Sequence, residues 1–287
     1  MILCRPMLAL AVLVVPVVAK AQPSEPFPAP FVIEHHLVDA SLEGTPVTGE
    51  TVRDTYGGSF LVSERPDGNR TIVDFARREL TEVRPTEGTY WSLSFGRFAE
   101  LRKRLVDAEK TETISEVRTQ AAREKRPVRI EEVPDGAEGK ARGALSATGS
   151  AGRRLRASVE GGPALDVWLD VSAPRLTAAG VAVLADFERN VLGAADGEVS
   201  PADLLEAVRL KEGGALAVRT RRGVGRAEAL RDDGPYLETV VTKAMPVAAL
   251  PASLVSVPEG LRRVPSPLEV VVSWAEDEAA LRQRGRK

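Results

Sequence analysis

The chain has 287 residues, of which 43% are apolar and 28% charged, and this composition excludes a disordered or fibrous protein. The length allows one large domain or two modest ones. The formal net charge is −2, and a chain without a basic excess is not expected to bind nucleic acid.

The first 21 residues have the pattern of a secretory signal peptide. Arg5 supplies the positive charge, residues 7–18 are apolar, and Ala19-Lys20-Ala21 is a small-x-small cleavage site. The apolar run is shorter than the roughly 20 residues that a membrane span needs, so the alternative of an uncleaved anchor is less favoured. We therefore expect cleavage after Ala21 and a secreted protein, located in the periplasm or outside the cell.

The mature chain is predicted to lack cysteine chemistry. The only cysteine, Cys4, lies ahead of the apolar run, which is also the wrong position for a lipid-attachment cysteine. Cleavage removes it, leaving no disulfide and no cysteine-based metal site. Cleavage also removes Arg5 and Lys20, so the formal charge becomes −4. No segment of the mature chain is apolar for long enough to span a membrane.

The first half of the mature chain is predicted to form strands. Residues 22–30 read as a Pro-rich leader. Strands are then expected at 31–38, 51–56, 59–65, 70–75, 79–84 and 89–95. The last three alternate apolar and polar residues and are separated by turns, which is typical of an antiparallel meander with one covered face. Trp91, Leu93 and Phe95 are predicted on the covered face, opposite Tyr90, Ser92 and Ser94.

Helical spacing appears after this meander. Helices are expected at about 97–125 and 174–192. A third begins at Ser200-Pro201, an N-cap followed by proline, and ends at Gly213-Gly214. Further strands are expected at 127–133, 155–159, 165–171, 215–222, 226–231, 235–244 and 268–274. Residues 134–152 form a Gly/Ala-rich insertion, and residues 275–287 a charged tail.

These elements predict an α+β protein with one domain over residues 31–274. Its sheet is a curved antiparallel β-sheet, or half-open barrel, with two or three helices packed on the concave face. Aromatic residues make up only 5% of the chain. The core is therefore predicted to consist of Val, Leu and Ala rather than stacked rings.

Three stretches resemble secreted bacterial domains related to the lipoprotein-localisation factors. They are "TIVDFARRELTEVRPTEGTYWSLS", "DVWLDVSAP" and "VAALPASLVSVPEGLRRV". The similarity covers most of residues 31–264, although the family commonly has an aromatic residue where Val255 stands. The resemblance implies a half-open barrel closed by helices. For the localisation factors proper, it implies binding of acyl chains, and its motifs contain no catalytic residue.

No catalytic or metal-binding group is predicted from the residues themselves. His35 and His36 are adjacent, so on a strand they point to opposite faces and cannot easily share a metal. A Ser/His/Asp hydrolase would need one of them as its base, and no G-x-S-x-G motif is present. The contiguous pairs Glu131-Glu132 and Asp232-Asp233 do not suit a glycosidase, whose carboxylates face each other across a gap. Gly223-Val224-Gly225 lacks the context of a dinucleotide loop.

Two groups of residues remain as candidate binding surfaces. Arg154, Arg156, Arg219 and Arg221 alternate along two strands, where they form either a solvated sheet face or an anion contact. Trp91, Leu93, Phe95, Trp168, Leu184 and Phe187 either fill the core or face a ligand. The resulting hypothesis is a noncatalytic protein that binds an apolar ligand, an acyl chain or a lipoprotein, without a cofactor. The alternative is an envelope scaffold or interaction protein with a filled core.

The signal peptide yields a first testable prediction. The exported protein should begin at Gln22, because cleavage is expected directly after the small-x-small site. Intact-mass spectrometry of the purified exported protein measures this directly. Retention of Met1, or a lipid attached to Cys4, would contradict it.

Overall fold

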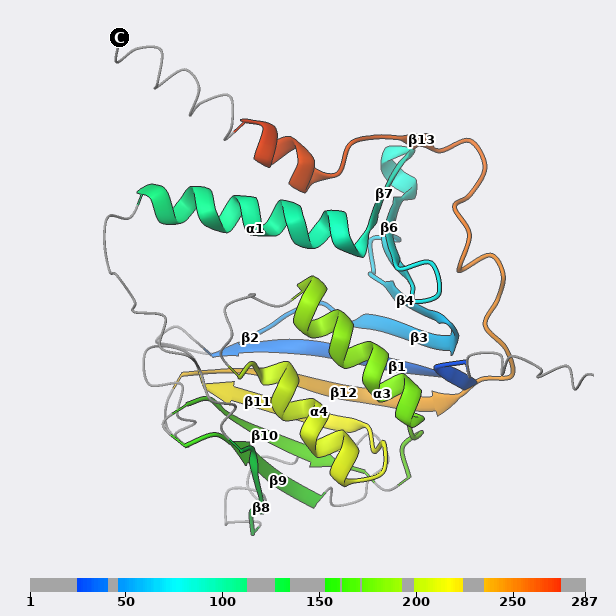
Figure 1. The fold of residues 1–287 in the computed structure, drawn as a ribbon. Coiled ribbons are helices and arrows are strands. Elements are labelled where there is room, and N and C mark those ends of the chain that lie inside the picture. Colours follow the sequence, from blue (N-terminus) through cyan, green and yellow to red (C-terminus); the bar gives the residue numbers. More distant parts are fainter. Residues whose placement is uncertain are drawn as a thin grey trace, which may run out of the picture.

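The computed structural model describes residues 25–40, 46–112, 127–134, 153–160, 162–170, 172–192, 199–223 and 235–274, with the backbone alone for 106–112. In this part of the chain, one curved 13-stranded sheet is covered by helices on its concave face (Figure 1). The fold is therefore α+β, with a mostly antiparallel sheet that does not close, as predicted.

The strands are β1 (Phe27–Ala40), β2 (Val47–Thr48), β3 (Val52–Gly58), β4 (Phe60–Glu64), β5 (Arg70–Asp74), β6 (Glu79–Arg84), β7 (Thr89–Ser94), β8 (Arg129–Glu132), β9 (Arg153–Ser158), β10 (Ala164–Leu169), β11 (Ala217–Gly223), β12 (Tyr236–Pro246) and β13 (Arg262–Arg263). The helices are α1 (Phe95–Glu112), α3 (Ala178–Phe187) and α4 (Pro201–Lys211), with a 3₁₀ turn η1 (Pro85–Glu87) and a π-helical turn η2 (Glu188–Leu192). A further helical segment covers 267–274.

Strand β1 lies at the centre of the sheet. On one side it pairs with β3, which starts an up-and-down run in chain order to β7. On the other side it pairs with β12, and the order then returns through β11, β10 and β9 to β8. These pairs are antiparallel, whereas β13 adds to β7 in parallel. Strand β1 therefore joins two meanders.

Strand β1 begins earlier than predicted, inside the segment expected to be a Pro-rich leader. Phe27 is only 2% exposed, so this segment contributes to the core. Pro28 and Pro30 are accommodated because the pairing with β3 is irregular between Phe27 and Phe31. Proline within a sheet is tolerated at such irregularities, where no ladder hydrogen bond is lost.

The predicted meander is confirmed. Leu61, Val73, Leu80 and Leu93 lie directly opposite one another across β4–β7 and form one buried row on the helix-covered face. Trp91 lies on the same face, two residues from Leu93, and is 6% exposed. The intervening residues point to the outer face of the sheet, as period-two alternation requires.

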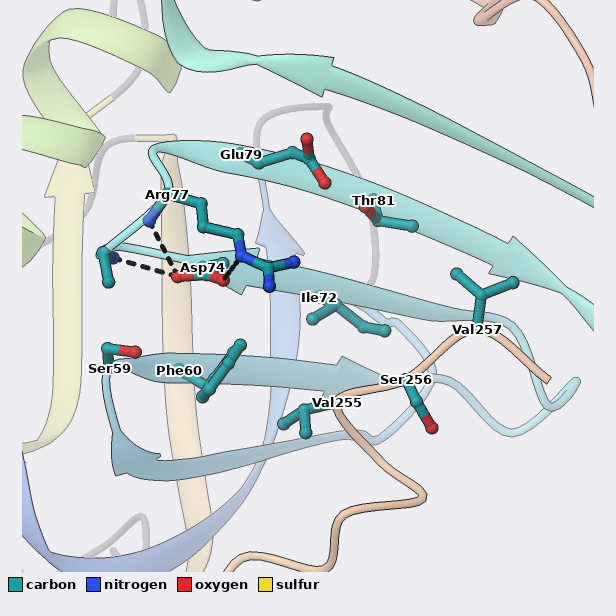
Figure 2. Close-up of a pocket in the computed structure, with 11 residues that line it drawn as sticks. Ser59, Phe60, Ile72, Asp74, Arg77, Glu79, Thr81, Val255, Ser256 and Val257 are labelled. Atoms are coloured by element: carbon teal, nitrogen blue, oxygen red, sulfur yellow. Dashed lines mark hydrogen bonds and ion pairs between the residues drawn. The ribbon is translucent and has the colours of Figure 1, made fainter.

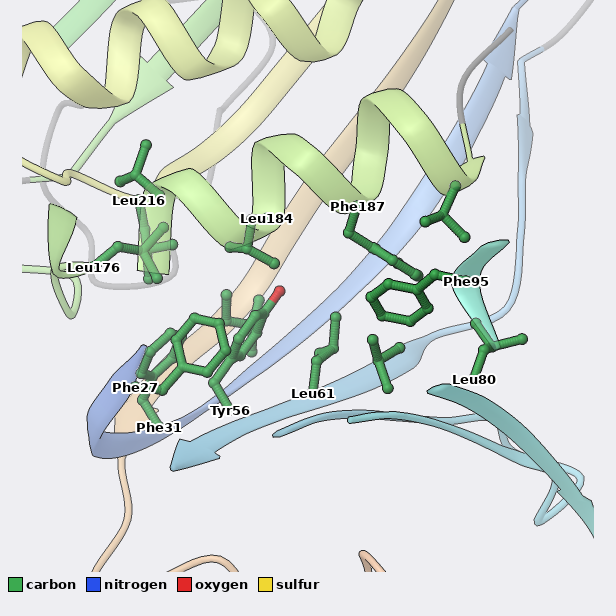
Figure 3. Close-up of a cluster of buried hydrophobic side chains, with 14 of the residues drawn as sticks. Phe27, Phe31, Tyr56, Leu61, Leu80, Phe95, Leu176, Leu184, Phe187 and Leu216 are labelled. Atoms are coloured by element: carbon green, nitrogen blue, oxygen red, sulfur yellow. The ribbon is translucent and has the colours of Figure 1, made fainter. Parts of the chain in front are cut away.

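The helices cover the sheet through one main apolar cluster (Figure 3). Helix α3 contributes Leu184 and Phe187, and α1 contributes Leu101. Two polar contacts fix the helices in place: Arg102 of α1 donates to the Val191 carbonyl of η2 at 3.0 Å, and Arg78 pairs with Asp186 of α3 at 3.2 Å. A second cluster lies between α4 and strands β9 and β10.

The prediction of a core without ring contacts is wrong. Phe31 stacks on Tyr56 at 4.6 Å between ring centroids, and Tyr56 meets Phe27 edge-on at 5.3 Å. The chain of contacts continues through Phe75 to Phe187. Composition misled here because the few aromatic residues are concentrated in one cluster, where paired rings add stability beyond their buried area.

The outer face of β4–β7 is also covered, by a segment without regular structure that we call the strap (residues 247–261). The strap packs on Val62, Ile72 and Val83, which form a separate buried cluster. Gly57 allows this close approach, because a Cβ there would lie 2.9 Å from Leu250. Residues of these strands are thus buried on both faces.

The strand predicted at 268–274 is wrong, because residues 267–274 are helical. Ser266 caps this helix: its Oγ accepts from the Glu269 backbone N–H at 3.2 Å, and Glu269 accepts from the Ser266 N–H at 2.9 Å. This is a capping box, with Pro267 at the first helical position. The run of three valines favoured a strand, but the cap outweighs that preference.

Other boundaries shift within the described residues. Helix α3 begins at Ala178 rather than Pro174, because Thr177 is the N-cap and accepts from the Gly180 N–H at 2.9 Å. Helix α4 has the predicted limits. Its end requires Gly214, which has φ = +80° and no room for a Cβ beside the Leu176 carbonyl. The predicted helix over 113–125, residues 135–152 of the insertion, the strand at 226–231 and the tail lie outside the described residues.

Trp91 provides a test of the face assignment. We expect Trp91→Ala to lower the free energy of unfolding by about 3–5 kcal/mol, as large-to-small changes in cores do. Chemical denaturation measures the difference. Trp274 is the matched control: it is 68% exposed, so Trp274→Ala should change stability by less than about 0.5 kcal/mol. Equal effects at the two positions would contradict the assignment.

Asp203 provides a test with a defined pH dependence. Burial works against its ionisation, but hydrogen bonds from Ser200 and Arg189 outweigh this and lower its pKa. A carboxyl with a lowered pKa stabilises the fold above its ordinary pKa, and this contribution is lost as the pH falls through the folded-state pKa. Asp203→Asn should therefore cost about 1 kcal/mol at neutral pH, as loss of a helix cap does.

Urea denaturation of both proteins over a pH series checks this dependence. The difference between wild type and Asp203→Asn should shrink as the solution becomes acidic enough to protonate Asp203 in the wild type. A constant difference would show that the charge of Asp203 does not stabilise α4.

Candidate functional site

A pocket of about 530 Å³ lies on the outer face of the sheet, between strands β4–β6 and the strap (Figure 2). The strap provides one wall with Val255, Ser256 and Val257. The strands provide the floor, and the turn between β5 and β6 provides the opposite rim. The Ser256 carbonyl accepts from Arg70 Nη2 at 2.7 Å, which ties this part of the strap to β5.

The floor consists of two rows of side chains that cross the three strands. In the first row Phe60, Asp74 and Glu79 lie directly opposite one another. In the second row Ile72 lies opposite Thr81. Residues two apart on a strand are about 7 Å apart, so the rows are adjacent. With Val255 and Val257 on the wall, the pocket has an apolar side and an acidic side.

Asp74 shapes the rim of the pocket. Its Oδ1 accepts from the backbone N–H groups of Ala76 and Arg77, both at 3.0 Å. These bonds hold the tight turn that leads to Arg78, which has φ = +53°. Among the described residues, Asp74 Oδ2 has only a looser ion pair of 3.7 Å with Arg77 Nε. One oxygen therefore maintains the backbone, and the other faces the pocket.

Glu79 has no comparable structural contact. Its side chain is half-buried at the pocket, and within the described residues its carboxylate makes neither a hydrogen bond nor an ion pair. The cross-strand partners of Glu79 are Asp74 on β5 and Ser94 on β7. A carboxylate in this position is available to a ligand.

The apolar residues singled out from the sequence lie elsewhere, on the helix-covered face. Trp91, Leu93, Phe95, Leu184 and Phe187 are all in the main cluster, each 3–7% exposed. Their side chains contact other parts of the same cluster, for example Phe95 and Phe187 with ring centroids 5.1 Å apart. Trp168 is the exception: it is only half-buried, and although it packs against this cluster, the strand register places it on the opposite face, beside Arg154 and Arg219.

The four candidate arginines lie together on the outer face of β9–β11, in what we call the arginine layer (Arg154, Arg156, Asp166, Trp168, Arg219, Arg221 and Glu238). Asp166 is fully buried and accepts from Arg154 and, at 2.7 and 3.0 Å, from Arg156. Arg219 pairs with Glu238 at 2.6 Å.

The aromatic rings of this region lie against the arginines. Arg154 and Arg219 lie over the Trp168 ring at 5.0 and 4.7 Å, and Arg221 lies over the Tyr236 ring at 3.7 Å. Guanidinium groups stack well on aromatic faces. The arginine side chains therefore cover this part of the sheet and pair with carboxylates of the same chain, Asp166 and Glu238.

The histidines do not form a catalytic site with a neighbouring serine. His35 Nε2 lies 3.0 Å from Asp54 Oδ2, and Ser63 Oγ donates to Asp54 Oδ1 at 2.6 Å. The carboxylate lies between the other two groups, so the serine proton is directed to Asp54 and not to the imidazole, unlike in a hydrolase. His36 follows on the opposite face. In the described ranges, no group of three or more His, Cys, Asp or Glu could hold a metal ion.

A buried ion pair lies beneath α4, close to Tyr56. Arg209 Nη1 is 3.5 Å from Glu188 Oε1, and the Arg209 side chain is 10% exposed. Burial raises the pKa of Glu188, although Arg209 works in the opposite direction. Burial, and then the charge of Asp54, raise the pKa of Tyr56 well above its ordinary value. The ion pair joins α4 to η2.

The remaining sequence candidates are dispersed. Glu131 and Glu132 lie on the edge strand β8, where Glu131 pairs with Arg129 at 2.5 Å and Glu132 with Arg153 at 3.2 Å. Gly223 ends β11. Residues 224–225 and Asp232-Asp233 lie outside the described residues.

Sequence reasoning missed the pocket. Its floor residues are the members of the meander that alternation assigns to the uncovered face, and no helix or strand was predicted for the strap. One signal was present: Phe60 and Ile72 are large apolar residues at outward positions. Apolar residues on both faces of neighbouring strands indicate that both faces are covered.

No protein-family model and no curated protein matches the chain. Among solved structures, an uncharacterized conserved protein from Thermus thermophilus is similar over 83% of this chain and 90% of its own, at 10% identity and a TM-score of 0.38. A putative outer membrane lipoprotein-sorting protein domain from Vibrio parahaemolyticus is similar over 78% and 88%, at 9% identity and a TM-score of 0.30.

PNGF-II is similar over 86% of this chain, at 9% identity and a TM-score of 0.34, but the chain spans only 33% of PNGF-II. At these TM-scores the similarities do not identify a family, and they carry no argument about function. The helices in the described part of the chain are all too short or too polar to cross a membrane.

Proposed function

We propose that this is a noncatalytic, secreted or periplasmic binding protein that takes an apolar group into the outer-face pocket. The observation that supports this is the apolar side of the pocket, formed by Phe60, Ile72, Val255 and Val257. Its volume of about 530 Å³ lies within the roughly 300–1,000 Å³ that small-molecule pockets occupy. An acyl chain, or the lipid of a lipoprotein partner, is an apolar group of this kind.

The outer face suits this role better than the helix-covered face. Between sheet and helices, Trp91, Leu93 and Phe187 pack against other side chains of the main cluster. On the outer face, the strap covers Val62 and Ile72 but leaves the pocket at its border with the β5–β6 turn. An apolar ligand placed there gains on the order of 0.8 kcal/mol for each buried methylene.

The alternative function is an envelope scaffold or interaction protein without a small ligand. The arginine layer favours it, because arginine, tryptophan and tyrosine are enriched where proteins contact one another. The pairing of these arginines with Asp166 and Glu238 fits a structural role equally well, so the pocket carries the proposal.

Binding of the neutral apolar dye Nile red tests the proposal. The mature protein should bind the dye saturably, with a rise in its fluorescence. Ser59 lines the pocket and is half-buried, so Ser59→Trp should fill the space. We expect affinity to fall by about tenfold or more, because overfilling a packed site costs on the order of 1–3 kcal/mol.

Ser253→Trp is the matched control, because Ser253 is exposed on the same strap and does not line the pocket. It should leave dye binding unchanged. If the folded protein binds no dye, the binding proposal fails and the interaction alternative leads. If Ser59→Trp leaves binding unchanged, the ligand lies elsewhere in the molecule.

A further inference from the structure

We infer that the ligand of the outer-face pocket is an organic cation, in which an ammonium group is attached to an apolar chain. This inference rests on the proposed function, because it concerns the second half of the same pocket. The apolar side accounts for the chain of such a ligand. The acidic side, formed by Asp74 and Glu79, accounts for its charge.

The two acidic residues are neighbours on adjacent strands. Asp74 on β5 and Glu79 on β6 are direct cross-strand partners, and both point to the outer face. Side chains in this relation have Cβ atoms about 4.5–5.5 Å apart, and like charges placed there destabilise a sheet. A cation bound between them would remove this repulsion, whereas an anion would increase it.

The protein provides little positive charge of its own at this position. Among the described residues that line the pocket, Arg77 is the single cationic one. Its side chain is 80% exposed, and its Nε remains 3.7 Å from Asp74 Oδ2. An exposed ion pair of this length contributes little, because water screens it. Glu79 lacks even this contact within the described residues.

The apolar side and the acidic side of the pocket lie next to each other. Phe60 lies directly opposite Asp74, and Ile72 lies one row away from it on the same strand (Figure 2). The separation between rows is about 7 Å. An alkyl chain lying on Ile72 and Val255 thus brings an attached ammonium group to the carboxylates. The Phe60 ring beside them favours a cation further, through its electron-rich face.

Three ligands with the same decyl chain test the inference by isothermal titration calorimetry, below their micelle concentrations. Decyltrimethylammonium is cationic, decyl maltoside neutral and decanoate anionic. The ammonium compound should bind about fivefold more tightly than the maltoside. This difference lies at the upper end of the range of affinities that a partly exposed ion pair contributes. Decanoate should bind most weakly. The advantage of the cation should decrease as salt is added.

Two substitutions should act in opposite directions. Glu79→Gln should weaken binding of decyltrimethylammonium about fivefold and leave decyl maltoside unchanged. Arg77→Gln should strengthen binding of the ammonium compound, because it removes the competing internal cation. Glu131→Gln, on the distant strand β8, makes the same change in charge as Glu79→Gln and should have no effect.

The outcomes separate the two proposals. If all three compounds bind equally well, or if decanoate binds best, the cation inference is wrong and the apolar pocket stands. If Glu79→Gln lowers the affinity for decyltrimethylammonium no more than Glu131→Gln does, the cation inference is also wrong. If none of the three binds to the folded protein, both proposals fail.

Discussion

The fold depends on the pairing of β1 with strands on both of its sides. In each meander, strands that follow one another along the chain lie side by side, although α3 and α4 intervene between β10 and β11, and β1 connects the two meanders. The pairing with β12 joins residues near opposite ends of the chain, from Phe31 with Pro246 to Ala40 with Tyr236. This long-range ladder aligns the two halves of the sheet. The sheet residues Phe27, Phe31 and Tyr56 then form part of one continuous surface, which α3 covers.

The outer face of this single sheet is completed in two different ways. Over β4–β7 the strap covers the outward apolar residues Val62, Ile72 and Val83, whereas the outward residues of β9–β11 include arginines that pair with Asp166 and stack on Trp168. A guanidinium group can lie flat on a ring and still reach water, so the second half needs no covering segment. The pocket occurs in the first half, because a covering segment that departs from the sheet leaves space at its border.

The sequence allowed local features to be predicted better than distant ones. Strand β6 has its predicted limits because alternation and the flanking turns specify it without reference to the rest of the chain. The helix at 267–274 was missed because three consecutive β-branched valines favour a strand, whereas the Ser266–Glu269 cap starts a helix there. The pocket could not be predicted, because it requires the position of Val255 relative to Ile72, and nothing local determines how the strap crosses the meander. The ring cluster likewise unites Phe27 and Phe187, which are far apart in sequence.

The two acidic residues of the pocket differ in what their charges do for the fold. Asp74 uses one oxygen to hold the turn at Ala76 and Arg77, so a change at this position alters the backbone as well as the charge. Within the part of the chain that the structure describes, Glu79 makes no such contact, and beside Asp74 its charge opposes the pairing of β5 with β6. A neutral side chain at Glu79 would serve the sheet better. The charge of Glu79 is therefore explained more readily by the ligand proposed for the pocket than by the stability of the fold.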